Sequence, residues 1–207
     1  MYRPLAFAMD DKAALNDVIR WRVFATVACV IDGAIAVAYA PVVLDADDGP
    51  HGSVRFHLAG NNPVAAVPDG TALAFSFLGP DAYVSPDWYK TQGRVPTWNY
   101  IAVEGRGAAQ RMDSDQLRQL LVDLSAAEEN KLLPKKPWTI DKVPEDRMVT
   151  LMNAIVGFSV RFVTLEGKFK LSQNVTSEDA EGVMRGLVQR GDANGRGIAE
   201  AMRRTRT

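Results

Sequence analysis

The chain of 207 residues is poor in the side chains that build disulfides and metal centres, with one cysteine and two histidines. The single cysteine, Cys29, excludes an internal disulfide framework and is typical of a protein in a reducing cytosol. Cys29 lies in the apolar run 23–30, which predicts a buried, inert thiol. Even together with His51 and His57, it cannot supply the usual ligands of a zinc site, so we expect no structural metal.

Long hydrophobic runs and an excess of charge of either sign are also missing. No apolar stretch approaches the ~18 residues that a membrane span requires. The N-terminal residues 1–4 lack the charged and apolar regions of a signal peptide. The formal net charge of −1 gives no general attraction to nucleic acid or to an anionic membrane. We therefore expect a cytoplasmic protein that is not attached to a membrane.

The common catalytic signatures are absent as well. The sequence has no G-x-S-x-G nucleophile elbow, no Walker loop and no dinucleotide-binding glycine fingerprint. The glycine-rich segment 191–197 lies between two expected helices rather than after a strand, which is typical of a flexible turn. If the protein carries out redox chemistry, a bound cofactor has to supply it.

The composition and the strand pattern predict one globular core. Hydrophobic residues make up 47% and charged residues 24% of the chain, which is ordinary for a globular protein. The apolar runs 23–30 and 34–44 flank Asp32-Gly33, a pair that predicts a tight hairpin because it tolerates positive φ. Residues 53–58 alternate between apolar and polar side chains, as a half-buried strand does. Further strands are expected at 71–78, 97–109 and 157–171, with a long loop at 79–96.

Helices are expected around these strands. Asp113 with Gln116 forms a capping-box pattern, and Thr176 with Asp179 has the spacing of another helix start. Other helices are expected after Asp10 or Asp11 and at 145–154. This order predicts an α+β, mainly β, fold: a small antiparallel barrel with peripheral helices. We expect residues 1–175 to form the barrel domain and 176–207 its helical extension, ending in a solvated basic tail rather than a DNA-reading helix pair.

Two stretches place hydrogen-bonding groups among apolar or aromatic residues at strand-like spacing. They are Val95-Pro96-Thr97-Trp98-Asn99-Tyr100 and Leu165-Glu166-Gly167-Lys168-Phe169-Lys170-Leu171-Ser172-Gln173-Asn174. A strand used only for packing would carry Val or Ile at Asn99, Lys170 and Gln173. Polar groups in such surroundings need partners, and a bound ligand is one way to supply them.

Together with residues 82–89, these stretches resemble the signature of the PaiB-like FMN-binding proteins, a branch of the split-barrel flavoproteins related to the pyridoxamine phosphate oxidase-like proteins. The resemblance runs from Tyr2 to Leu187, with 154–158 as a fourth matching piece. It implies a split β-barrel that binds FMN in a groove between the two subunits of an intertwined homodimer. It also implies, by family name, a transcriptional regulator, with direct DNA binding left open.

The resemblance implies flavin contacts in three regions. The first is the start of strand 97–109. The second is the turn after 53–58, which resembles the corner that holds the FMN phosphate in related barrels. The third is the end of strand 157–171, which is expected to contact the phosphate or the ring of the flavin. These contacts come either from the same subunit or from the partner subunit. The expected cofactor-binding residues are His57, Asn61, Asn62, Thr97, Trp98, Asn99, Tyr100, Lys168, Lys170 and Gln173.

These residues also have purely structural interpretations. Trp98 and Tyr100 fit the packing of a core. Lys168 and Lys170 share one strand face because they lie two residues apart, and lysines commonly protect a solvated edge. His57 fits a simple surface position.

The sequence departs from the family pattern at several positions. Relatives carry histidine in the strand occupied here by residues 38–41, and also at the positions of Asp81 and Glu104. Gly60 replaces the basic residue before the Asn-Pro corner, which removes a cation for the phosphate. These departures predict FMN binding that is weakened or lost. Two alternatives to the regulator therefore stand: an FMN-dependent oxidoreductase acting on a small molecule, and a flavin-free dimeric descendant.

Overall fold

The computed structural model describes residues 1–206, which form two compact units that share three long strands. The barrel unit contains residues 19–77 and 104–165, and the helical unit contains 1–18, 78–103 and the chain from residue 166 onward. The shared strands run from one unit into the other: β5 (Ala72–Val84), β6 (Thr97–Arg111) and β7 (Ile155–Lys170).

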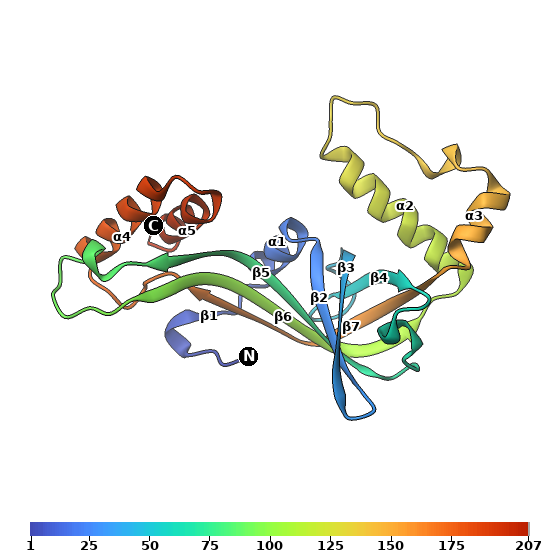
Figure 1. The fold of residues 1–207 in the computed structure, drawn as a ribbon, viewed down its shortest axis with the longest axis horizontal. Coiled ribbons are helices and arrows are strands. Elements are labelled where there is room, and N and C mark those ends of the chain that lie inside the picture. The colour runs from blue at the N-terminus through green and yellow to red at the C-terminus, as the bar shows by residue number, and fades with distance from the viewer. Residues whose placement is uncertain (207) are drawn as a thin grey trace. The chain divides into compact units, whose positions relative to one another are not determined.

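Hydrogen bonding joins the strands in the order β1-β7-β4-β3-β2-β5-β6. Because β7 also pairs with β6, the six strands from β2 through β7 form a closed ring. The other strands are β1 (Ala8–Met9), β2 (Phe24–Ile31), β3 (Ala34–Asp45) and β4 (Ser53–Ala59). The pairs β2–β3, β2–β5, β3–β4 and β4–β7 are antiparallel. The α+β split barrel expected from the sequence is thereby confirmed, but helices and strands contribute about equally, so the fold is not mainly β (Figure 1).

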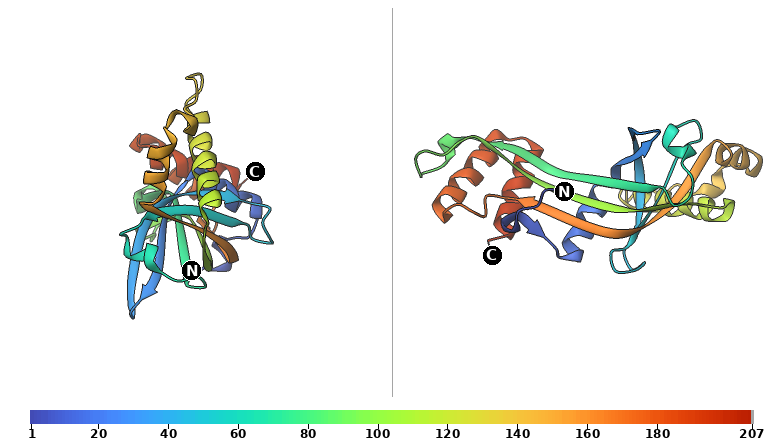
Figure 2. Two further views of the ribbon diagram at one scale, coloured as in Figure 1. Left: turned by 90° about the vertical axis from the view of Figure 1, so that its right-hand side faces the viewer. Right: turned by 90° about the horizontal axis from the view of Figure 1, so that it is seen from below.

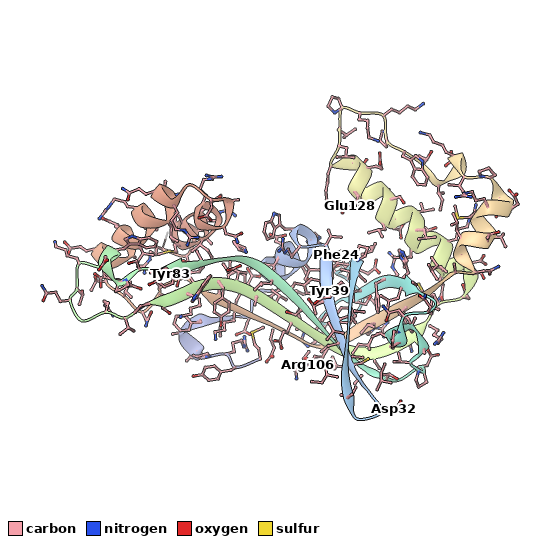
Figure 3. All side chains as sticks on the ribbon, in the orientation of Figure 1. Phe24, Asp32, Tyr39, Tyr83, Arg106 and Glu128 are labelled. Atoms are coloured by element: carbon pink, nitrogen blue, oxygen red, sulfur yellow. The ribbon has the colours of Figure 1, made fainter. Side chains whose placement is uncertain are left out.

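The hairpin of β2 and β3 forms where the sequence predicts it. Asp32 (φ 49°) and Gly33 (φ 78°) occupy the turn with positive φ, as a two-residue hairpin loop requires. In Figure 3, Asp32 marks the tip of the hairpin, and Phe24 and Tyr39 lie toward its open end. Cys29 lies on the inner face and is buried, as predicted, and this burial raises the pKa of its thiol.

Phenylalanine rings fill the barrel. The ring of Phe56 lies 5.4 Å from that of Phe75 and 5.5 Å from that of Phe158, while Phe75 and Phe162 are 5.7 Å apart. Such edge-to-face and offset contacts stabilise a core beyond area burial alone. Gly105 of β6 is required here, because a Cβ at this position would lie 2.5 Å from atoms of the Phe162 ring.

The helix α2 (Ser114–Asn130) is held against the barrel by an arginine. Its start is the predicted capping box: the Asp113 carboxylate accepts from the Gln116 amide N–H at 2.8 Å, and the Gln116 side chain accepts from that of Asp113 at 3.1 Å. Arg55 of β4 donates to Asp45 at 2.6 and 2.9 Å and to Asp123 of α2 at 2.8 Å. Nearby lie η2 (Pro63–Ala66), η4 (Ile140–Lys142) and α3 (Glu145–Met152), of which α3 packs beside α2.

The helical unit is built on a pair of C-terminal helices. The elements found in it are η1 (Leu5–Phe7), most of α1 (Lys12–Trp21), η3 (Pro86–Trp88), α4 (Ser177–Arg190) and α5 (Ala193–Arg204). Figure 2 shows α4 and α5 side by side. As predicted, Thr176 caps α4 by accepting from the Asp179 amide at 3.2 Å. Within the described part of the chain, no helix has the length and apolar character needed to cross a membrane.

Two expectations about this unit were wrong. The chain after Arg190 is not a solvated tail, because Ile198, Ala199 and Met202 form a buried face of α5. The loop expected at 79–96 is shorter, because β5 continues through Gly79 to Val84. Gly79 does not end the strand; it allows close approach to β6, since a Cβ there would lie 3.0 Å from that of Ile101.

The remaining loop, 85–96, is bound to α4 by hydrogen bonds to Asp179. The buried carboxylate of Asp179 accepts from the backbone N–H of Lys90 at 2.8 Å, from that of Thr91 at 2.9 Å and from the Arg94 guanidinium at 2.9 Å. These bonds, led by the one from the Thr91 amide, lower the pKa of Asp179 to about 2. The loop is therefore an ordered part of the unit.

Candidate functional site: a lysine–tyrosine cluster

The start of β6 and the end of β7 bring together four of the predicted residues. Lys168 lies with its Nζ 5.3 Å from the centroid of the Tyr100 ring and 5.1 Å from that of Tyr2, and it donates to the Tyr2 carbonyl oxygen at 3.2 Å. Lys170 donates from its Nζ to Thr97 Oγ1. These five residues, Tyr2, Thr97, Tyr100, Lys168 and Lys170, are called the lysine–tyrosine cluster below.

The cluster holds positive charge without a matching carboxylate. Within residues 1–206, neither Lys168 nor Lys170 forms a salt bridge. Lys168 is only 8% exposed, and its backbone pairs with Ala8 of β1, so a solvated edge does not describe it. Burial is the main cause that lowers the pKa of Lys170; Tyr100 opposes this shift, and the Lys168 ammonium adds a smaller lowering effect. Partly buried cations of this kind favour an anionic ligand.

Next to the cluster in sequence, Trp98 forms an exposed aromatic pair with Tyr83 of β5. Trp98 follows Thr97 and shares a face of β6 with Tyr100, because alternate strand residues point the same way. Its ring is 52% exposed and lies 6.1 Å from the ring of Tyr83, at an angle of 75°; Tyr83 is labelled in Figure 3. The core interpretation of Trp98 is therefore wrong, and its exposed face can cover a flat ring.

Two other predicted residues in this unit are turned inward. Asn99 is 0% exposed, and its Nδ2 donates to Ser172 Oγ at 2.9 Å. The Gln173 amide stabilises its own turn, accepting from the Leu171 N–H at 2.8 Å and donating to the Phe169 carbonyl. Both amides are thus engaged within the protein, and the geometry gives no support for the expected flavin contacts of Asn99 and Gln173.

The strand-to-helix corner after β4 lies in the barrel unit, and its donors are also engaged. Gly60 donates its N–H to the Ala154 carbonyl at 2.8 Å, and Asn62 donates its N–H to the Ala59 carbonyl at 2.9 Å. The Asn62 side chain accepts from the Val64 N–H at 2.9 Å, while Asn61 is exposed. A phosphate would need free amide groups or a cation here. With Gly60 in place of a basic residue, the corner fits a phosphate poorly.

His57 belongs to the face of the barrel that α2 covers. It pairs with Gly157 of β7, and a Cβ on Gly157 would lie 2.9 Å from Leu117 of α2. The Nδ1 atom of His57 is buried without a hydrogen-bond partner, and burial lowers the pKa of the ring. The surface interpretation of His57 is therefore wrong, because the ring is half-buried.

The lysine–tyrosine cluster offers more donors for a phosphate monoester than the corner does. Two ammonium groups and a hydroxyl are the donors that a phosphate monoester takes, and charge-assisted bonds of this kind are the strong ones. Sequence reasoning missed two residues that shape the cluster and its surroundings, Tyr2 and Ser172. Each stands within a matching segment, but neither residue type signals a contact so distant in sequence.

Comparison with known proteins identifies the family of the chain. The sequence model of the family described as "Putative FMN-binding domain" matches residues 1–164. The chain belongs to this family. Over 204 residues it is 28% identical to the protein "Protease synthase and sporulation protein PAI 2" of Bacillus subtilis, covering 98% of this chain and 96% of the relative. It is thus a PaiB-like member of the FMN-binding domain family, and membership supports a flavin as its cofactor.

Solved structures share the fold of this family member. One is the FAD and heme binding protein from Mycobacterium smegmatis, with a TM-score of 0.59 and 15% identity over 84% of this chain and 78% of that one. Another is the flavocytochrome Anf3 from Azotobacter vinelandii, with a TM-score of 0.55 and 14% identity over 84% of this chain and 75% of that one. At these identities the likeness establishes the split-barrel fold alone. Lys168 and Lys170 lie beyond the segment that the family model matches.

Proposed function

We propose that this protein is a homodimeric FMN-binding regulator that holds the flavin phosphate at the lysine–tyrosine cluster. The observation that carries the proposal is the pair of partly buried ammonium groups, Lys168 and Lys170, with which no carboxylate of residues 1–206 forms an ion pair. A phosphate dianion would supply the missing charge. In this proposal the pair supplies the cation that is missing at Gly60. The expectation of weakened or lost FMN binding stays a prediction, which the titration below tests.

Each residue of the cluster has a distinct part in binding. The Tyr2 and Tyr100 rings hold Lys168 by cation–π contacts, which keeps its ammonium in place. Thr97 fixes the Nζ of Lys170. The exposed ring of Trp98 offers apolar cover for a flat ring system. A bound flavin would supply redox chemistry, while these side chains bind and orient it.

The regulatory role does not require direct contact with DNA. The arginines of α4 and α5 are largely engaged within the protein: Arg185 pairs with Glu181, Arg190 with Asp192, and Arg204 with Glu200. Because three of the five arginines of these helices are paired with carboxylates, the helices offer a weak match for a phosphate backbone. We therefore expect no salt-sensitive retention of the purified protein on duplex DNA. Retention that is lost with added salt would contradict this part of the proposal.

The homodimer is supported by an apolar face on the hairpin of β2 and β3. Cross-strand partners on the outer face include Val30 with Ile35, Ala28 with Val37 and Thr26 with Tyr39. The large side chains of this face are exposed: Phe24, Val30, Ile35, Val37 and Tyr39. Contiguous apolar surface of this kind marks an interface, and a second copy would cover it.

The phosphate site is tested by titrating the protein with FMN and with riboflavin, which differ by the phosphate alone. Charge-assisted contacts are worth about 1.5–3 kcal/mol each, so the parent should prefer FMN strongly at low salt. The double variant Lys168→Met, Lys170→Met keeps the apolar stems and should lose most of this preference. The matched control is Lys131→Met, Lys135→Met, since both of these lysines are exposed and ion-paired.

The outcomes separate the parts of the proposal. A double variant that prefers FMN as strongly as the parent would place the phosphate elsewhere. If the parent bound neither FMN nor riboflavin, the proposal that the protein carries a flavin would be wrong. Bleaching of bound flavin by NAD(P)H in the purified protein would favour the oxidoreductase instead of the regulator.

A further inference from the structure

The barrel unit carries a cavity of about 580 Å³ that contains no residue of the lysine–tyrosine cluster. It is lined by residues of β6 and β7, two strands that pair with each other, and by the loop 46–52 between β3 and β4. Ser159, Arg161 and Val163 of β7 line it from the outer face of the strand, because the residues that alternate with them are buried. The exposed hairpin residues of the proposed dimer face do not line it.

Only one edge of the Arg161 guanidinium is occupied by the protein. Its Nε and Nη2 both donate to the same oxygen of Asp48, Oδ1, with Nε at 3.0 Å. This hydrogen bonding is the main cause that lowers the pKa of Asp48, and a bond with Ser53 lowers it further, so the carboxylate is charged near neutral pH. Within residues 1–206, Nη1 of Arg161 has no hydrogen-bond or ion-pair partner. The end of the guanidinium, where Nη1 and Nη2 lie side by side, is therefore open to a second acceptor.

Arg118 of α2 shows the same end of a guanidinium when it is occupied. Its Nη1 and Nη2 donate to the two carboxylate oxygens of Glu145, each at 3.0 Å. Two parallel N–H groups match the two oxygens of a carboxylate, and such charge-assisted pairs are both strong and specific. Arg161 lines the cavity without a side chain in the place that Glu145 takes at Arg118.

The rest of the lining suits an apolar body attached to a carboxylate. Pro50, Ala108 and Val163 supply apolar contacts, and Val163 is 70% exposed. His51 and Gln110 border the same cavity, and neither side chain has a hydrogen-bond partner among the described residues, so both can donate to a ligand. The volume lies within the range of about 300–1,000 Å³ that is usual for small-molecule sites.

We infer that this cavity binds a small carboxylic acid with an apolar body, whose carboxylate accepts from Nη1 and Nη2 of Arg161 while its body contacts Val163 and Ala108. Asp48 holds the guanidinium in place, so less side-chain freedom is lost on binding. The negative charge of Asp48 also opposes a dianion, which favours a monocarboxylate over a phosphate. The inference goes beyond the proposed function and uses none of the residues that hold the flavin there.

The test uses the full chain and two probes of the same shape, 4-(trifluoromethyl)benzoate and 4-(trifluoromethyl)benzamide. Fluorine NMR measures their binding through the broadening and shift of the trifluoromethyl signal as protein is added. We expect the parent to bind the benzoate severalfold more tightly than the benzamide, because only the carboxylate accepts charge-assisted bonds with both oxygens. Equal affinities for the two probes would overturn the inference, and this comparison requires no variant.

Variants locate the carboxylate. Arg161→Gln should lose the preference for the benzoate, and Arg161→Lys, which keeps the charge without the two parallel N–H groups, should weaken it. The matched control Arg118→Gln should keep the preference, because Glu145 already occupies that guanidinium. The double variant Lys168→Met, Lys170→Met should also keep it, because neither lysine lines the cavity.

Two results would overturn the assignment to Arg161. One is a preference for the benzoate that survives Arg161→Gln. The other is a preference that only the lysine double variant abolishes, which would place the probe at the lysine–tyrosine cluster. The preference for FMN over riboflavin should be the same in Arg161→Gln as in the parent, so failure here and failure of the proposed FMN site are distinguishable.

Discussion

Asn99 and Ser172 form a buried hydrogen-bonded pair, with 2.9 Å between Asn99 Nδ2 and Ser172 Oγ. The pair joins the start of β6 to the turn that follows β7, and Met202 of α5 lies 3.6 Å from the same Nδ2. Ser172 adopts positive φ (58°), a conformation that needs support from its neighbours. Asn99 therefore serves the packing of the helical unit, although its motif first suggests a ligand contact.

Replacing Asn99 by Ala should destabilise the fold and leave flavin affinity nearly unchanged. The change removes the buried hydrogen bonds between Asn99 and Ser172, which costs about 1–3 kcal/mol. Chemical denaturation measures the loss, and a flavin titration under native conditions checks the affinity. The control is Asn61→Ala, because Asn61 is exposed. Unchanged stability together with weakened FMN binding would instead show that Asn99 contacts the flavin.

Local signals in the sequence predicted much of the fold. The positive φ of Asp32 and Gly33, the capping box at Asp113 and the Thr176 cap depend on neighbouring residues only, and all are as expected. Hydrophobic alternation located β4, because a half-buried strand repeats every two residues, and continuous apolar runs located β2 and β3. The two-residue period of a strand also predicted that Lys168 and Lys170 lie on the same face of β7.

The partners of the polar residues could not be predicted in this way. Asn99 meets Ser172, and Asp179 meets the loop at Lys90, across separations of 73 and 89 residues. Only the path of the whole chain brings such groups together. Gly79 resembled a strand end for the same reason, since the close contact with Ile101 that requires it comes from another strand. Residue types alone do not distinguish an inward amide from one that faces a ligand.

Asp179 should make stability depend on pH in the acid range. Its pKa is about 2 in the folded protein against an ordinary 3.8, so the folded state binds fewer protons than the unfolded state in this window. The stabilisation is therefore fully present above the unfolded pKa, and it is lost as the pH falls through the folded pKa. Asp179→Asn should be less stable near neutral pH and should lose this part of the acid dependence.

Denaturation at a series of pH values measures the effect, with Glu178→Gln as the control. Glu178 neighbours Asp179 but pairs with Lys90 at the exposed surface. Such pairs contribute little to stability. If Asp179→Asn retained the parent's full loss of stability between about pH 4 and pH 2, carboxylates elsewhere would be its source.

The outer face of the β2–β3 hairpin should hold two copies together. Burying a large apolar side chain contributes about 1.5–3 kcal/mol, so placing charges on this face should dissociate the dimer. We expect sedimentation of the parent to show a dimer at micromolar concentration, and that of Ile35→Lys, Val37→Lys to show a monomer with unchanged circular dichroism. Val149→Lys is the control, because Val149 is as exposed as Val37 (51% and 49%) but lies on α3. A monomeric parent, or a double variant that remains dimeric, would show that the two copies do not meet through this face.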